Sequence, residues 1–118
     1  MYRHAAFLVR QAGMTHEAFV EHWQHEHTPI AREIEGVVRY LTTTPLDPEG
    51  AAFDGIADLY FDDLDALRAS TGRETDSYDS DHPDQVAVRR DATEFLDLDA
   101  LRQFAGETTV QKDRPDSE

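Results

Sequence analysis

The chain of 118 residues has the length of a single domain, and its hydrophobic content of 39% is enough for one compact core. It contains no cysteine, which excludes disulfide bonds, thiolate nucleophiles and cysteine-held metal or iron–sulfur sites. With 25 acidic residues against 11 basic ones, its net charge of −14 repels phosphate backbones and anionic membrane surfaces, so we expect no nucleic-acid partner.

The first third of the chain is predicted to form a strand followed by a broken helix. Residues 2–10 alternate between two sides, as the residues of a strand do. Thr15 stands at the N-cap position of a helix whose core-facing stripe holds Phe19, Trp23, Ile30 and Ile34. Because Pro29 lacks an amide hydrogen, we expect the helix to kink or restart there and to end at Gly36.

A hairpin and a second helix are predicted next. The segments 37–44 and 54–61 are rich in β-branched and aromatic side chains, and a turn separates them. The second segment places two sets of alternating residues on opposite faces: Ile56, Asp58 and Tyr60 on one, and Ala57, Leu59 and Phe61 on the other. The apolar spacing that follows predicts a helix over about 64–70.

The remaining part of the chain has weaker patterns. Residues 72–84 are polar and acidic, which predicts an exposed loop. Pro83 can occupy the first turn of a further helix, and residues 104–111 are predicted to form the last strand. We expect residues 112–118 to be an acidic flexible tail, so that residues 1–111 make up the single domain.

This order of elements predicts an α+β fold of the ferredoxin-like type. It is a split βαβ arrangement with a four-stranded antiparallel sheet that carries its helices on one face. The strands are apolar on both faces, so the open face of the sheet needs a cover. A second copy of the chain would supply that cover, and we therefore expect a homodimer that forms a dimeric α+β barrel.

The composition also indicates where the protein works. No segment approaches the ~20 apolar residues of a membrane span, and the amino terminus lacks a secretory signal, so we expect a cytoplasmic protein with no membrane partner. Lys112 is the only lysine, and aspartate (15) outnumbers glutamate (10), a halophilic pattern for an acidic protein. We expect the protein to unfold or lose its dimer at low ionic strength.

Two segments resemble the EthD family. The segment from Met14 to Tyr40, MTHEAFVEHWQHEHTPIAREIEGVVRY, has the Phe, the His-Trp pair and the His-x-Pro that lead into a Gly and a strand with Arg-Tyr. The segment from Phe53 to Phe61, FDGIADLYF, is similar to the third strand of the family. The resemblance covers residues 2–111, although residues 72–91 carry no matching motif.

The resemblance implies a dimeric α+β barrel with a small cleft between sheet and helix. Some members use this cleft for cofactor-independent chemistry on aromatic, lactone or polyketide-like compounds. The family takes its name from an association with ether degradation alongside a cytochrome P450 system. The sequence has no Gly-rich phosphate loop, Ser nucleophile elbow or dinucleotide fingerprint, so we expect no cofactor.

Three histidines in the segment HWQHEH raise the question of a metal site. His22 could share a helical face with His25 or Glu26, as two ligands of a zinc ion would. His27, however, lies about 140° from His22 on an α-helix, and the segment is not the HExxH arrangement. We expect no metal, and we interpret His22 and His25 as solvated side chains.

His27 is the first candidate catalytic residue. It flanks the predicted buried stripe next to Trp23 and corresponds to the His of the family's His-x-Pro motif. An imidazole with a pKa near ~6.5 can give or take a proton at neutral pH. The competing interpretation is structural, with the ring bonded to a strand carbonyl so that it ties the kinked helix to the sheet.

Asp58 is the second candidate catalytic residue, because a buried carboxylate in mid-strand needs a partner. Arg39 or His27 could be that partner, and a His–Asp couple would raise the basicity of the ring. Alternatively, Asp58 faces solvent or an arginine at a dimer interface. The candidate substrate-binding residues are Trp23, Arg39, Tyr40 and Tyr60.

Together these features predict a protein that binds a small apolar or aromatic organic ligand. The first hypothesis is a cofactor-independent acid/base enzyme of the isomerase, lyase or dehydratase type, with His27 as the proton carrier. The alternatives are a non-catalytic binding or accessory protein of a catabolic pathway, and a cofactor-free monooxygenase that uses the same pocket.

Overall fold

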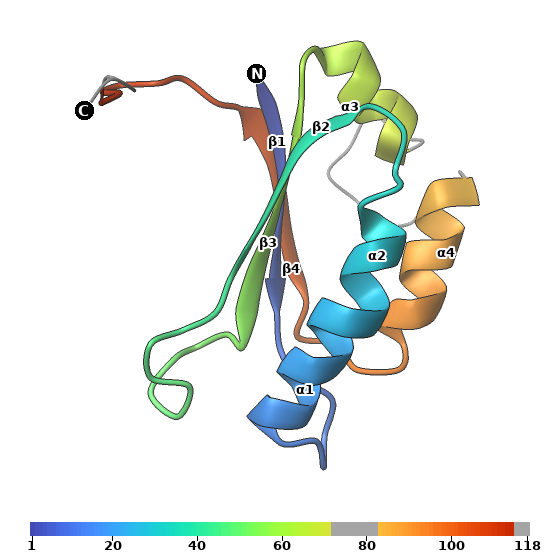
Figure 1. The fold of residues 1–118 in the computed structure, drawn as a ribbon, viewed down its shortest axis with the longest axis vertical. Helices are drawn as coiled ribbons and strands as arrows, with labels where there is room; N and C mark the ends of the chain where they lie inside the picture. Colours follow the sequence, from blue (N-terminus) through green and yellow to red (C-terminus); the bar gives the residue numbers. More distant parts are fainter. Residues whose placement is uncertain (72–82, 115–118) are drawn as a thin grey trace.

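The structure, a computed structural model, describes residues 1–71 and 83–114. Four antiparallel strands form one sheet in the order β2-β3-β1-β4, and the helices lie on one side of it (Figure 1). The strands are β1 (Tyr2–Leu8), β2 (Val37–Thr43), β3 (Gly55–Phe61) and β4 (Arg102–Glu107). The helical segments are α1 (His16–His22), η1 (Trp23–His27), α2 (Thr28–Ala31), α3 (Leu64–Thr71) and α4 (Pro83–Ala92). The predicted ferredoxin-like α+β fold is confirmed.

Most predicted boundaries agree with the structure to within two or three residues. Thr15 caps α1 through its side-chain oxygen, which accepts from the Ala18 amide at 3.1 Å. The last strand begins two residues before the predicted start and ends at Glu107. The predicted loop lies outside the described residues except for its last two positions, which belong to α4, and residues 115–118 of the predicted tail also lie outside them.

The predicted break before Pro29 is a π-helical turn. The amide of Thr28 donates to the carbonyl of Trp23, five residues back, where an α-helix would connect residues four apart. Pro29 has no amide hydrogen for the carbonyl of His25, and its ring crowds that carbonyl, so the helix widens before it. The Thr28 hydroxyl bonds the Gln24 carbonyl at 2.8 Å and closes the turn.

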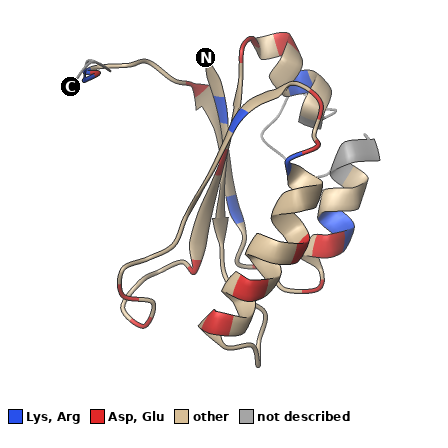
Figure 2. Ribbon diagram, in the orientation of Figure 1, with Lys and Arg blue, Asp and Glu red and all other residues tan. Residues whose placement is uncertain are grey.

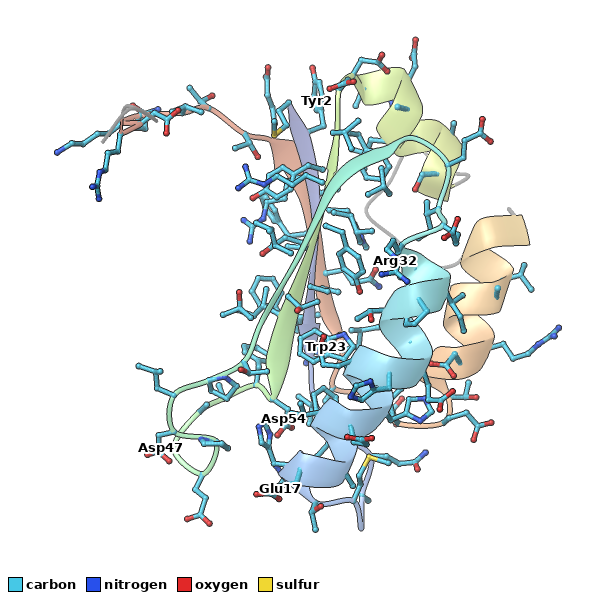
Figure 3. The ribbon with its side chains drawn as sticks, in the orientation of Figure 1. Tyr2, Glu17, Trp23, Arg32, Asp47 and Asp54 are labelled. Atoms are coloured by element: carbon cyan, nitrogen blue, oxygen red, sulfur yellow. The ribbon has the colours of Figure 1, made fainter. Side chains whose placement is uncertain are left out.

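The core lies between the helices and one face of the sheet. Its larger cluster packs Phe19, Trp23 and Phe95 against Ala6, Leu8 and Ala57 of the sheet. The Phe19 ring lies 5.5 Å from that of Trp23 and 5.4 Å from that of Phe95, centroid to centroid. A second cluster continues the core beyond it, with Phe61, Leu67, Ile34 and Val88. Figure 3 shows Trp23 between the helix and the sheet.

Gly55, the glycine of the Asp-Gly pair that starts β3, is required by this packing. A Cβ atom at this position would overlap the six-membered ring of Trp23. The indole therefore lies directly on the backbone of β3, and any larger residue at position 55 must displace it.

Asp54, next to Gly55, fastens the start of β3 to the end of β1. Its carboxylate accepts from the Arg10 amide at 2.9 Å, from Arg10 Nη1 at 2.7 Å and from His16 Nδ1 at 3.0 Å. Burial by itself would raise the pKa of the Asp54 carboxyl, but the hydrogen bonds from Arg10 and His16 outweigh burial and hold the pKa below its usual value.

None of the described helices covers the other face of the sheet (Figure 1). Phe104 on β4 and Leu41 on β2 are 57% and 39% exposed there. Acidic residues lie mainly on the helices, at the strand ends and in the β2–β3 loop (Figure 2). Arginines are found at positions along the strands. In the described part of the chain, no helix has the length and apolar character needed to cross a membrane.

Candidate functional site

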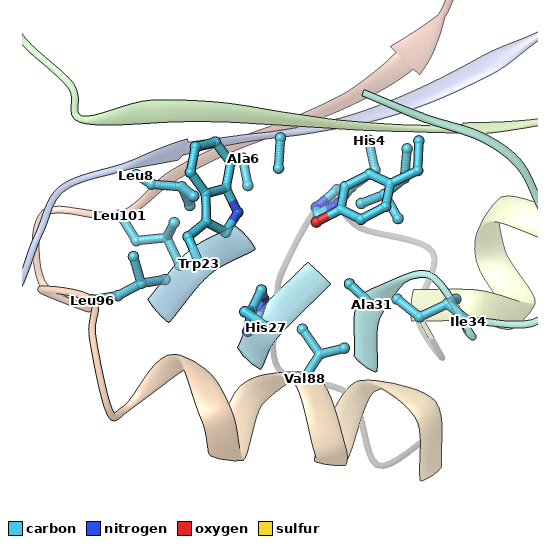
Figure 4. Close-up of a pocket in the computed structure, with 13 residues that line it drawn as sticks. His4, Ala6, Leu8, Trp23, His27, Ala31, Ile34, Val88, Leu96 and Leu101 are labelled. Carbon is cyan, nitrogen blue, oxygen red and sulfur yellow. The ribbon is translucent and has the colours of Figure 1, made fainter. Parts of the chain in front are cut away.

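A small hollow lies between the sheet and the helices (Figure 4). Its volume is about 30 Å³, and apolar side chains from β1, β3, the helices and the segment before β4 make up most of its wall. Four polar side chains also line it: His4, Trp23, His27 and Tyr40. The hollow thus combines an apolar interior with a few hydrogen-bonding groups, as small-molecule sites do.

His27 is buried at the edge of this hollow and is held by an aspartate from another helix. Only 7% of the residue is exposed, and its Nδ1 lies 2.8 Å from Oδ2 of Asp91 on α4. The imidazole also packs on the ring of Phe95, 4.9 Å between centroids. The ring is fixed on two sides, so its orientation toward the hollow is set by the fold.

Asp91 holds a second imidazole as well. Nε2 of His22 lies 3.1 Å from both carboxylate oxygens, and the His22 ring stacks on Phe95 at 4.7 Å. In the π-turn, residues five apart lie one turn apart, so His22 and His27 reach the same carboxylate. The prediction that the two rings point in different directions assumed an α-helix, and it is wrong for that reason.

These contacts define the protonation state of His27. A carboxylate only accepts hydrogen bonds, so Nδ1 of the neutral ring carries the hydrogen and Nε2 is left with its lone pair. Burial lowers the pKa of His27 more strongly than the Asp91 hydrogen bond and charge raise it. At neutral pH the ring is therefore an uncharged base that is oriented by a carboxylate.

Tyr40 and Trp23 add two hydrogen-bond donors to the wall. Burial raises the pKa of the Tyr40 hydroxyl to about 12, although a hydrogen bond with the Trp23 side chain lowers it. Trp23 is 0% exposed, and its Nε1 makes no hydrogen bond of standard distance and angle among the described residues, so its bond with Tyr40 is weak. His4, also buried, donates from Nε2 to Oε1 of Gln103 at 2.9 Å.

The described residues contain no group of three or more potential ligands arranged to hold a metal ion. His25, the third histidine of the segment, is largely exposed, with 68% of its side chain accessible, and its nearest charged partner is Glu21 at 3.7 Å. The interpretation of His25 as a solvated side chain is thus confirmed. The same interpretation of His22 is wrong, because His22 bonds Asp91.

A sequence profile of the EthD domain matches residues 11–99. The chain belongs to the EthD family. An EthD family protein from Bacillus halodurans is 24% identical, with a TM-score of 0.69 over 92% of this chain and 100% of that one. A DABB family protein with a ferredoxin-like fold from Mesorhizobium loti is 17% identical, with a TM-score of 0.66 over 92% and 97% of the two chains.

A third similar structure is a dimeric ferredoxin-like protein of unknown function from Thermobifida fusca. It is 19% identical to this EthD protein, with a TM-score of 0.61 over 92% of this chain and 90% of that one. At these identities the three structures support the fold. A search of curated proteins gave no match.

Asp58 of this EthD protein does not meet His27. Its Oδ1 accepts from Nε of Arg3 at 2.6 Å, and both residues lie on the open face of the sheet, opposite the helices. The predicted partners of Asp58, Arg39 and His27, were therefore wrong. Successive residues of a strand point to opposite faces, so Asp58 is separated from the hollow by the sheet itself.

The four predicted substrate-binding residues are divided in the same way. Trp23 and Tyr40 line the hollow. Arg39 and Tyr60 lie on the open face, where the Arg39 guanidinium is 6.0 Å from the centre of the Tyr60 ring. The predicted substrate-binding set thus mixed two residues that line the hollow with two residues on the opposite face of the sheet.

Asp91 is the residue that sequence reasoning missed in this EthD domain. It belongs to the segment in which no family motif was recognised. The positions Val88, Asp91, Ala92 and Phe95 follow the spacing of a buried helical stripe, and all but Asp91 are apolar. An aspartate within such a stripe signals a buried partner, because a carboxylate there is costly without one.

Proposed function

We propose that this EthD protein is a cofactor-independent acid/base enzyme that binds a small, largely apolar organic compound in the hollow and moves a proton on it with His27. The observation that carries the proposal is the buried His27 ring, held through Nδ1 by Asp91 at 2.8 Å at the edge of the hollow. An oriented, neutral imidazole beside an apolar cavity is the arrangement that general acid/base catalysis requires.

The chemistry follows from the protonation state of the ring. Nε2 removes a proton from a carbon or oxygen of the ligand, and the ring becomes an imidazolium. Asp91 stabilises that cation by its charge and its hydrogen bond. Returning the proton to another atom of the ligand gives an isomerisation, and returning it to a leaving group gives an elimination.

We further propose that the protein acts as a homodimer, with the open faces of two sheets packed together. Phe104 and Leu41 are large apolar side chains that a partner would cover. The Arg3–Asp58 ion pair lies on the same face and would be desolvated by the partner. The similar Thermobifida fusca protein is described as dimeric, which favours a dimer here as well.

The catalytic proposal can be tested by proton exchange. Cyclopentanone in D₂O loses its α-hydrogens to a general base, and proton NMR follows the loss. We expect the protein to accelerate this exchange and His27→Asn, whose amide can keep the bond to Asp91, to abolish the acceleration. The matched control is His25→Asn on the exposed side of the same segment.

Two results would contradict the catalytic proposal. If His27→Asn exchanged the ketone as fast as the wild-type protein, His27 would not be the base. If cyclopentanone bound to the wild-type protein without any acceleration, the protein would be a non-catalytic binding protein.

A further inference from the structure

We infer that Trp23 and Tyr40 form a subsite for an acceptor oxygen, and that the ligand is an uncharged compound whose carbonyl oxygen lies between the indole N–H and the phenol O–H. This inference deepens the proposed function and rests on it, because it places the reacting part of the ligand against His27.

The first observation is the poorly satisfied indole N–H of Trp23. Its Nε1 is buried and makes no hydrogen bond of standard distance and angle among the described residues, only a weak one with the Tyr40 hydroxyl, and the residue is 0% exposed. Buried N–H groups in native proteins are nearly always paired, and an unpaired one lowers stability. In Figure 4 the nitrogen edge of the indole faces the space bounded by Trp23, His4 and His27.

The indole has little freedom to find another partner. Its six-membered ring lies on the backbone of Gly55, and the ring of Phe19 packs against it at 5.5 Å. Turning the indole would break both contacts and leave a void in the core. The donor is therefore fixed in place before any ligand binds, as preorganised binding groups are.

The second donor is the hydroxyl of Tyr40. The pKa of this hydroxyl is raised to about 12 by burial, so the group keeps its hydrogen at any physiological pH. Trp23 and Tyr40 both line the hollow, and the Trp23 N–H makes a weak hydrogen bond with the Tyr40 oxygen. A carbonyl oxygen has two lone pairs and can accept from both groups at once.

The charge of the wall selects a neutral ligand. Besides these two donors, the polar groups of the described wall are His27, which is neutral above its lowered pKa, and His4, which donates to Gln103. No lysine, arginine, aspartate or glutamate lines the hollow within the described residues. A carboxylate or ammonium ligand would be buried there without a counter-charge, which is unfavourable.

The subsite would also stabilise the enolate that forms when His27 removes a proton from the ligand. His27 Nε2 takes the proton from the carbon next to the carbonyl, and the electron pair of that C–H bond forms the C=C bond of an enolate. The carbonyl π electrons move to the oxygen. The negative oxygen then accepts from Trp23 Nε1–H and Tyr40 O–H, whose hydrogen bonds strengthen as charge develops.

The size of the hollow limits the first test ligands. A volume of about 30 Å³ corresponds to two or three water molecules at ~10–15 Å³ each. Acetone and cyclopentanone are therefore the ketones to try, and methylenecyclopentane is the hydrocarbon of matched shape that lacks the acceptor. A ligand as large as cyclopentanone must displace some of the lining side chains.

The experiment uses the fact that Trp23 is the only tryptophan of the chain. Its indole N–H gives a single resonance in a ¹⁵N–¹H correlation spectrum of the full-length protein. We expect acetone and cyclopentanone to move this resonance downfield in a saturable way. We expect methylenecyclopentane to bind more weakly and to leave the resonance without a hydrogen-bond shift. Tyr40→Phe should weaken cyclopentanone binding about tenfold, while Tyr2→Phe, outside the hollow, should not.

The outcomes separate this inference from the function on which it rests. If the ketone and the hydrocarbon bound equally well and neither moved the indole resonance, the subsite would be overturned, while the binding function would stand. If cyclopentanone exchange depended on His27 but not on Tyr40 and the indole resonance did not move, the subsite would again be overturned. If neither compound bound, both proposals would fail.

Discussion

His27 and Asp91 are joined by a hydrogen bond of 2.8 Å that connects the π-turn η1 to helix α4, 64 residues further along the chain. The contact does two things at once. It closes the helical layer over the sheet, and it sets the tautomer of the buried imidazole so that Nε2 is the basic atom. His22, bonded to the same carboxylate, makes Asp91 the centre of this layer.

Replacing Asp91 by asparagine tests this relationship. Asparagine keeps one acceptor oxygen but carries no charge, so Asp91→Asn should lower the pKa of His27 further and reduce ketone exchange by at least about tenfold. It should also lower the free energy of unfolding by about 1–3 kcal/mol, because one amide oxygen replaces a carboxylate that serves both His22 and His27. Titration of the histidine ring protons by NMR and urea unfolding measure these changes.

A suitable control for that variant is Asp97→Asn, since Asp97 caps the turn before β4 through the amides of Asp99 and Ala100, away from the histidines. If Asp91→Asn exchanged ketone at the wild-type rate with an unchanged His27 titration, Asp91 would have no positioning role.

The lowered pKa of His27 predicts how stability depends on pH. The folded ring resists protonation, while the unfolded ring takes a proton near 6.5, so the unfolded state binds more protons as the pH falls below that value. The contribution of His27 is complete above pH 6.5 and is lost toward lower pH, with a slope of at most about 1.4 kcal/mol per pH unit.

Unfolding measured from pH 7.5 to 5 should show this decline, and His27→Asn should flatten it. Asp54 titrates in a separate window, because its pKa is lowered from 3.8 and its contribution is lost only at more acidic pH. An unfolding free energy with the same pH dependence in wild-type and His27→Asn protein would contradict the assignment.

The sequence predicts the sheet and the helices well because their signals are local. The alternation in β1 and β3, the cap at Thr15 and the stop at Gly36 each depend on a few neighbouring residues, and Gly36 does adopt a positive φ of 89°. The family motif likewise points to His27 and Trp23 because both belong to one continuous segment.

The sequence does not reveal the pairing of charged residues, because each pair joins distant parts of the chain. The alternation in β3 correctly places Asp58 on the same face as Ile56 and Tyr60, but nothing local says which face the helices cover. Asp91 belongs to a helix whose spacing is visible, yet its partner depends on a π-turn that shifts His27 around the helix axis. A projection that assumes an α-helix places His22 and His27 on different sides, so it does not predict that both bind Asp91.

Gly55→Ala should destabilise the protein through Trp23. The added Cβ would overlap the indole ring, which cannot retreat because Phe19 packs behind it. We expect a loss of about 1–3 kcal/mol in the free energy of unfolding, together with a changed fluorescence of the single tryptophan. Gly50→Ala is the control, because its Cβ would meet only the flexible side chain of Asp47 and should change stability by less than about 0.5 kcal/mol.

The net charge of −14 predicts that association depends on salt. Two chains that pack their sheets together bring two strongly negative molecules into contact, and the repulsion is screened within ~3 Å at molar salt but extends over ~30 Å in dilute buffer. We expect light scattering to give a dimer mass in 2 M KCl and a lower mass, or an unfolded chain by circular dichroism, in 10 mM buffer.

A substitution on the open face separates this effect from general stability. Phe104→Lys places a charge where we propose the partner to lie, so it should abolish the dimer even in 2 M KCl while the monomer keeps its fold. Val110→Lys, an exposed position beyond the end of β4, is the matched control and should still dimerise. A protein that stays monomeric at every salt concentration, or a Phe104→Lys variant that dimerises like the wild type, would show that the sheet face is not the interface.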